Sequence, residues 1–187
     1  NSSVTVTGYS SGSIGVQVNG GAPLTAATTL SLTAIGSETY GLLVTDSLIA
    51  GGDLTISAGI ARADTMGMYM SVANKTIWST AGDIRINVDS KGPGADLRSP
   101  ILAGNAATPT SGGAISIAAS GAGGYRGLYT TSTASITAYG DVSLYGSNAA
   151  TTVPNWWTVA GLTGATSEHA LFFLYGTGAN GKSVFVN

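Results

Sequence analysis

A short motif recurs along this chain, and its repetition constrains the fold more than any other feature. The motif is a glycine and an aspartate, followed by two apolar residues with one polar residue between them. It is complete at residues 52–56, 82–86 and 140–144, and looser at residues 30–32 and 113–117. The first apolar residues of successive copies are 24, 30, 31 and 27 residues apart. Repeats in this range of lengths are typical of solenoid proteins.

A second recurring element is a glycine that precedes a short apolar strand. Gly15, Gly41 and Gly67 are each 26 residues apart, and Gly127 begins a similar segment. We assign residues 100–102, Pro-Ile-Leu, as the missing copy between Gly67 and Gly127. Each period then carries two or three short strands joined by corners of Gly, Asn, Ser and Thr.

The alternation of apolar residues predicts how the repeats pack. It directs one face of each strand inward, and a single period is too short to bury that face alone. Stacked periods bury it against one another at the ordinary inter-strand spacing of about 4.8 Å. We therefore predict an all-β parallel β-helix (solenoid) of about five to six coils, with Leu54, Ile84 and Ile115 as neighbours. A Greek-key sandwich is the alternative, but it does not explain the recurring motif.

The predicted domain organisation is a single solenoid over residues 1–187 with two loop insertions. Residues 89–99 and 148–166 interrupt the rhythm of the repeats, and residues 170–187 form either the last coil or a phosphate-loop-like tail. The chain begins with Asn1, so we expect a processed product or an excerpt of a longer protein.

Composition narrows the classes of function. Charged residues make up only 9% of the chain, against about 25% in ordinary soluble domains, whereas 43% of residues are hydrophobic. The net charge of −2, without a basic cluster, disfavours a nucleic-acid partner. No apolar run approaches the roughly 20 residues that span a bilayer, and there is no cysteine. We expect no cofactor, no bound metal and no membrane insertion.

The runs at residues 51–58, 82–86 and 140–144 resemble the repeats of filamentous haemagglutinin-type adhesins and autotransporter passengers. The resemblance covers about residues 1–147. It implies a right-handed β-helix, secretion through a bacterial outer membrane, and adhesion to a protein or glycan at a cell surface. Open coil ends expose unpaired backbone groups, so we also expect self-association through them.

A different motif lies near the C-terminus. Gly176, Gly181, Lys182 and Ser183 match the phosphate-loop pattern G-x-x-x-x-G-K-S, after an apolar strand. The surrounding stretch of about 25 residues resembles the Walker A region of phage and plasmid primase-helicases. That resemblance implies that Lys182 binds nucleotide phosphates and that Ser183 binds Mg²⁺. Because the preceding chain has no βαβ pattern, we instead expect residues 181–186 to form a strand of the last coil, with ATP binding as the alternative function.

Three aspartates, Asp53, Asp83 and Asp141, occupy the same place in their repeats. Stacked on one another they could form a carboxylate ladder for Ca²⁺, but corner aspartates more often accept hydrogen bonds from backbone amides. We favour the second role. His169 is the only histidine, which leaves a serine nucleophile with one candidate base, and we expect no catalysis.

Two segments carry candidate ligand-binding residues. The charged side chains of residues 89–99 suit a carbohydrate-active protein, our second alternative, although the Gly-Pro-Gly within that segment favours a mobile loop. These charged residues are Asp89, Lys91, Asp96 and Arg98. The candidate ligand-binding residues are Trp156 and Trp157, because exposed tryptophan suits sugar stacking and protein hot spots. The competing interpretation, which we rank slightly ahead, is a loop that caps an open coil end or covers the core.

Overall fold

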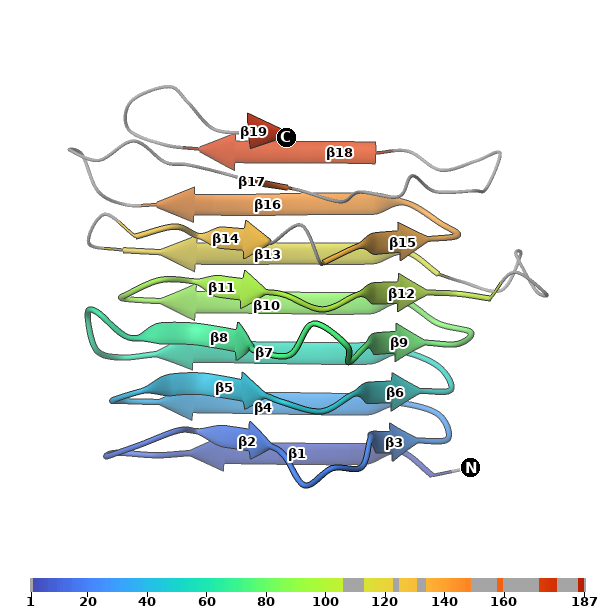
Figure 1. Cartoon of the computed structure of the whole chain (residues 1–187), viewed down its shortest axis with the longest axis horizontal. Coiled ribbons are helices and arrows are strands. Elements are labelled where there is room, and N and C mark those ends of the chain that lie inside the picture. The colour runs from blue at the N-terminus through green and yellow to red at the C-terminus, as the bar shows by residue number, and fades with distance from the viewer. Residues whose placement is uncertain are drawn as a thin grey trace.

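In the computed structural model, the chain winds as a coil of stacked parallel β-strands (Figure 1). The structure describes residues 2–105, 113–122, 125–130, 134–148, 158–159, 172–177 and 185–186. All elements within these residues are β-strands, which confirms the predicted all-β parallel solenoid. None of the described residues belongs to a helix that is long and apolar enough to cross a membrane.

Three parallel sheets form the walls of the coil. Sheet A consists of β1 (Val4–Tyr9), β4 (Leu30–Gly36), β7 (Leu54–Ile60), β10 (Ile84–Ser90), β13 (Ile115–Gly121), β16 (Val142–Asn148) and β18 (Phe172–Thr177). Sheet B consists of β2 (Val16–Val18), β5 (Tyr40–Val44), β8 (Met66–Met70), β11 (Ala95–Leu97) and β14 (Leu128–Thr130). Sheet C consists of β3 (Leu24–Ala26), β6 (Leu48–Ala50), β9 (Ile77–Ser79), β12 (Ile101–Ala103) and β15 (Ile136–Ala138).

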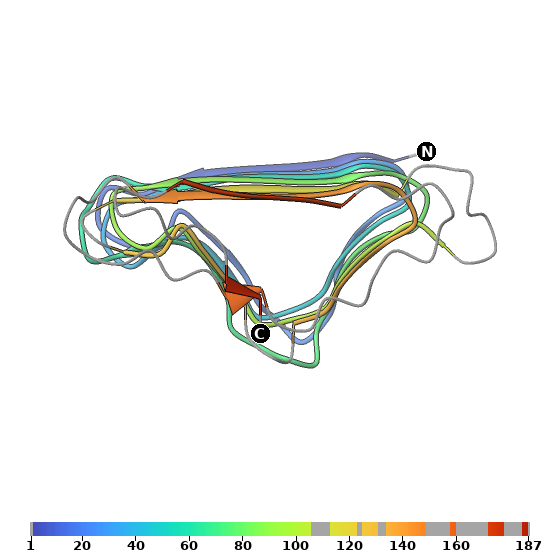
Figure 2. The ribbon, with the colours of Figure 1, turned by 90° about the horizontal axis from the view of Figure 1, so that it is seen from above.

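Five successive coils each give one strand to every sheet, and β16 and β18 extend sheet A beyond them. Two further short strands, β17 (Thr158–Val159) and β19 (Phe185–Val186), pair with each other. Seen along the coil axis, the cross-section is a flattened triangle with sheet A as its long side (Figure 2). The chain runs counterclockwise in that view as it rises toward the viewer, so the coil is right-handed (Figures 1 and 2).

The core is built by stacking like residues on like. Leu54 lies in register between Leu30 and Ile84, and Ile84 pairs onward with Ile115. All four side chains are buried, as the repeat predicts. Removing a leucine or isoleucine side chain from water contributes roughly 1.5–3 kcal/mol, so each aliphatic column holds neighbouring coils together.

The recurring glycines form a column at the corner where a sheet A strand turns into the next sheet B strand, which we call the A–B corner. The members of this column are Gly15, Gly41, Gly67, Gly94 and Gly127. A Cβ atom on Gly41 would come within 2.5 Å of the Gly67 carbonyl oxygen and would also overlap the Gly59 carbonyl oxygen. Glycine is needed here because two backbones approach each other directly.

Gly94 corrects the predicted assignment of residues 100–102. That segment overlaps β12, which pairs with β9 and β15 in sheet C. The missing glycine-led strand is Gly94 followed by β11, which pairs with β8 and β14 in sheet B. The sequence hides it because β11 is short and has the charged Asp96 at its centre.

The predicted insertion at residues 89–99 is also wrong, because these residues complete β10 and form β11. Half of the extra length of the third coil lies at residues 71–76, where six residues join β8 to β9 and only three join β5 to β6, and most of the remainder lies at residues 61–65, between β7 and β8. The extra length of the fourth coil lies between β12 and β13, where the chain passes from sheet C to sheet A. We call the connection between sheets B and C, such as residues 71–76, the B–C turn. The predicted insertion at residues 148–166 lies largely outside the described residues.

Candidate binding surface

The outer face of sheet A is broad and carries few charges. Every second residue of its strands points outward, so stacking arranges these side chains in columns. One column contains Thr7, Thr33, Ser57, Asn87, Ala118 and Tyr145, and the next contains Tyr9, Ile35, Gly59, Asp89, Ser120 and Ser147. Tyr9, Ile35 and Tyr145, the large hydrophobic residues that are exposed in the described part of the chain, all lie on this face.

Three shallow depressions of about 240, 290 and 340 Å³ adjoin on this face, and Asp89 lines all of them. Their floor is low because small residues occupy the positions between larger side chains. We call the first two depressions the Asp89 groove; it runs from Ile35 to Tyr145. Its remaining outward-facing lining is Ser57, Gly59, Asn87, Ala118 and Ser120.

Asp89 supplies the strongest hydrogen-bond acceptor of the groove. The Ser120 hydroxyl of the next coil donates to Asp89 Oδ1 across 2.6 Å, which fixes one carboxylate oxygen. The side chain is otherwise exposed. Asp89 is the only acid among the residues that line the three depressions. The groove therefore combines one carboxylate with hydroxyl and amide groups, an arrangement suited to hydrogen bonding a polar ligand.

The outer face of sheet B carries a cluster of tyrosine and arginine. The rings of Tyr40 and Tyr69 stack with their centroids 5.3 Å apart, and the Arg98 guanidinium lies 4.9 Å from the centroid of Tyr69. Arg98 is also paired with the buried Asp96 across 2.8 Å, and this hydrogen bond raises the pKa of Arg98. These contacts join adjacent coils and satisfy the charge of Asp96.

The four charged residues expected in one loop insertion are therefore divided between two faces. Asp89 lies on the outer face of sheet A, and Lys91 follows it at the A–B corner. Asp96 and Arg98 bind each other on the outer side of sheet B. Stacking in a solenoid separates residues that are neighbours in sequence, because the chain turns between the two strands.

The aspartates of the repeated motif act as corner residues. Asp53 Oδ1 accepts a hydrogen bond from the backbone amide of Asp83 across 2.9 Å. Asp83 Oδ1 accepts hydrogen bonds in turn from the amides of Gly113 and Ala114 at 3.3 and 3.1 Å. Each carboxylate thus bonds the backbone of the next coil, which confirms the predicted turn role of Asp53 and Asp83.

A continuous ladder of these carboxylates does not form. The register places Ala114 between Asp83 and Asp141, and Arg85 pairs with Asp83 across 2.8 Å. Across the described part of the chain, no group of three or more His, Asp or Glu side chains is placed to hold a metal ion.

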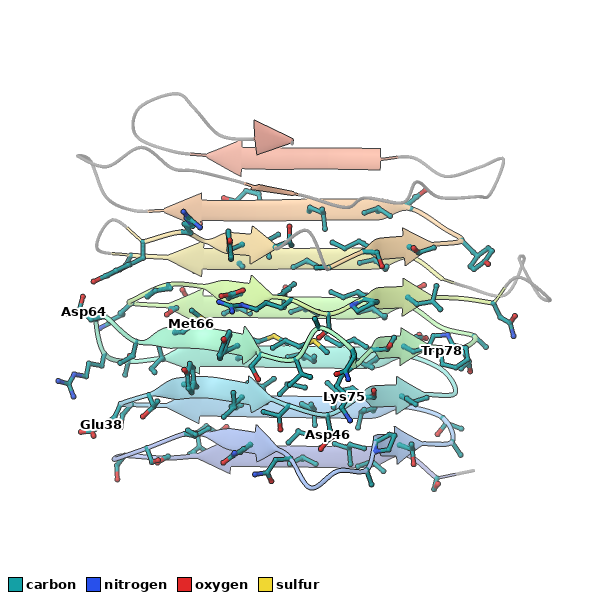
Figure 3. The ribbon with its side chains drawn as sticks, viewed as in Figure 1. Glu38, Asp46, Asp64, Met66, Lys75 and Trp78 are labelled. Carbon is teal, nitrogen blue, oxygen red and sulfur yellow. The ribbon has the colours of Figure 1, made fainter. Side chains whose placement is uncertain are left out.

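The sequence pattern did not reveal a buried charge at the B–C turn. Asp46 is only 3% exposed and accepts hydrogen bonds from Lys75 Nζ at 2.9 Å and from the Gly21 amide at 2.8 Å (Figure 3). The Lys75 hydrogen bond is the main reason that the pKa of Asp46 lies below its usual value. Because these three residues come from successive coils, we interpret the cluster as a structural clamp.

Most of the other predicted site residues lie outside the described residues. This applies to Trp156, Trp157, Gly181, Lys182 and Ser183, whose roles stay predictions. Gly176 lies in β18, opposite Gly146 of β16, so the strand before the phosphate-loop motif forms a further rung of sheet A.

The Asp89 groove was missed because its residues come from five coils. The sequence signal that could have found it is the position of polar residues relative to the repeated apolar pair. Asn87 and Asp89 follow that pair at outward positions of the strand.

Comparison of the chain with protein-family models, with curated proteins and with solved structures found no match. The family resemblances noted in the sequence therefore stay predictions, and the function must be argued from the surface itself.

Proposed function

We propose that this chain is a segment of a secreted or surface-exposed bacterial adhesin-like β-helix, which acts by binding or as a structural spacer rather than by catalysis. The observation that carries this proposal is the difference between the inward and outward positions of the sheet A strands. Inward positions repeat aliphatic residues (leucine, isoleucine or valine) and hold the coils together. Outward positions in a single column range from threonine to asparagine, alanine and tyrosine, so the scaffold presents a variable surface.

The low charge of the chain supports recognition at short range. With a net charge of −2 and few ionisable side chains, long-range electrostatic steering of a partner is weak. Specificity would then depend on shape, hydrogen bonds and apolar contacts on the outer faces. The Asp89 groove and the Tyr–Arg cluster of sheet B are the two surfaces that offer such contacts.

Surface exposure is tested with an antibody raised against this chain. Intact cells that produce the parent protein should be labelled as strongly as permeabilised cells. Labelling that requires permeabilisation would overturn the proposal.

Binding is tested separately by adhesion. Beads coated with the folded chain should attach to target cells, whereas beads coated with the heat-denatured chain should not. If beads coated with the folded chain also fail to attach, while surface labelling is positive, the spacer role is favoured over the binding role.

The nucleotide-binding alternative has its own test. We expect calorimetric titration of the chain with ATP and Mg²⁺ to give no binding heat. Micromolar binding that is lost in Lys182→Ala would instead support a working phosphate loop, since the lysine of this motif contacts the phosphates. Ser143→Ala, on the outer face of sheet A, is the control for a non-specific effect of substitution.

A further inference from the structure

We propose that the Asp89 groove binds a neutral linear polysaccharide, which lies along the coil axis with about one sugar unit per coil. This inference rests on the proposed binding function and adds a site and a ligand class to it. Groove geometry, polar chemistry and charge each support it.

The repeat distance of the groove is set by the sheet. Gly59, Asp89 and Ser120 occupy one column on β7, β10 and β13, so they follow one another at the inter-strand spacing of about 4.8 Å. A chain of β-1,4-linked pyranoses advances by a similar distance per sugar. A polymer laid along the axis therefore meets an equivalent position of the scaffold at each successive sugar.

The floor and ends of the groove offer apolar surfaces for the C–H groups of a sugar ring. Gly59 and Ala118 leave the floor low and apolar between the outward side chains. Tyr145, which is 38% exposed, and Ile35, which is 43% exposed, stand at opposite ends. Sugar C–H groups can pack on such surfaces, and aromatic rings combine apolar area with a polar group.

The polar groups lie where sugar hydroxyls need partners. Asp89 accepts hydrogen bonds, Asn87 can both donate and accept, and the Ser57 hydroxyl adds a third group on the neighbouring coil. The bond from Ser120 to Asp89 Oδ1 orients the carboxylate before a ligand arrives. Hydrogen bonds to a charged group are stronger than those between neutral groups, so Asp89 is the main polar contact.

The charge of the groove selects among polysaccharides. Asp89 is its only acid, and its lining contains no lysine or arginine. A uronate or sulfate chain would bring like charge toward Asp89, which disfavours acidic ligands. Lys91 lines only the third depression, on the far side of Asp89.

The test is calorimetric titration of the chain with cellotetraose and chitotetraose, with tetragalacturonate as the acidic comparison. We expect at least one neutral tetrasaccharide to bind and the acidic one to bind more weakly. Asp89→Asn should weaken neutral binding about tenfold, because it removes a charged acceptor without changing side-chain size. Glu38→Gln, an exposed acid away from the groove, should leave binding unchanged.

A second pair of variants tests the location by shape. Ala118→Trp fills the floor of the groove and should abolish binding, whereas Ser116→Trp lies on the same strand outside the groove and should not. Circular dichroism before each titration confirms that the variants are folded.

Failure of this inference is distinguishable from failure of the proposed function. If neither neutral tetrasaccharide binds, or if binding survives both Asp89→Asn and Ala118→Trp, the polysaccharide site is wrong. Cell adhesion by chain-coated beads would then still support the adhesin function. Absence of surface labelling would overturn the adhesin function whatever the sugars do.

Discussion

The A–B corner and the B–C turn connect the same coils, yet they obey different rules. The A–B corner has glycine at the same register position in all five coils from β1 to β15. The B–C turn has three residues between β5 and β6, six between β8 and β9, and no common residue type. Both connections vary in length from three to six residues, so the constant feature of the A–B corner is its glycine and not its length.

The difference shows what fixes a residue in a solenoid. At the A–B corner the backbones of sheets A and B approach so closely that even a methyl group overlaps a carbonyl oxygen. At the B–C turn the coils are joined through side chains, as in the Asp46–Lys75 pair. Close backbone contact restricts residue type, whereas side-chain contact restricts only volume and polarity.

The largest effect should follow from adding a methyl group at the A–B corner. Gly41→Ala places a Cβ atom against two carbonyl oxygens, so we expect a loss of about 3 kcal/mol in the free energy of unfolding, measured by urea denaturation. Gly12→Ala is the control, because no atom lies within 4 Å of its added Cβ, and its effect should stay within about 0.5 kcal/mol. Equal effects of the two variants would contradict the steric explanation.

A smaller, pH-dependent effect should follow at the B–C turn. The pKa of Asp46 is lowered in the folded chain, mainly by the Lys75 hydrogen bond, so the unfolded chain takes up a proton at higher pH than the folded one. The resulting stability is complete above the usual aspartate pKa and is lost as pH falls through the lower folded value.

Asp46→Asn should remove this part of the acid dependence, which is measured as the slope of unfolding free energy against pH. Lys75→Met should flatten the same slope, because it removes the main cause of the shift. Glu38→Gln, whose acid is 51% exposed in its pair with Arg62, is the control. A slope unchanged in both Asp46→Asn and Lys75→Met would refute the clamp.

The smallest effect should come from lengthening the B–C turn. Two glycines inserted between Ala73 and Asn74, which are both exposed, should cost less than about 1 kcal/mol, since loop entropy grows slowly with length. The same insertion between Glu38 and Thr39 should cost more, because it separates Gly36 from Tyr40, whose backbones are in close contact at the A–B corner. Thermal denaturation of the two variants compares them directly, and equal losses would show that the corners do not differ.

Some features of this molecule could be predicted because they depend on local alternation and repetition. Leu54, Ile84 and Ile115 were placed together correctly, because a period-two pattern that recurs fixes both the inward face and the stacking partner. The corner role of Asp53 and Asp83 followed from the turn chemistry of aspartate.

Other features could not be predicted, because they depend on which coil lies beside which residue. Gly94 was missed since its strand has only Ala95 and Leu97 as inward residues, too weak a signal beside the more apolar residues 100–102. Asp89 and Asp96 were expected in one loop, but the chain turns between them and places them on different sheets.

The sequence by itself determined that the chain is a parallel β-solenoid, because stacking of the repeats buries the apolar pairs and also explains why the motif recurs. Only the tertiary structure decided which glycine completes the A–B corner, which polar residues meet in the Asp89 groove and where Asp46 finds its partners. Those arrangements depend on the register between coils and on corner lengths, which bring together residues about 25 to 31 positions apart.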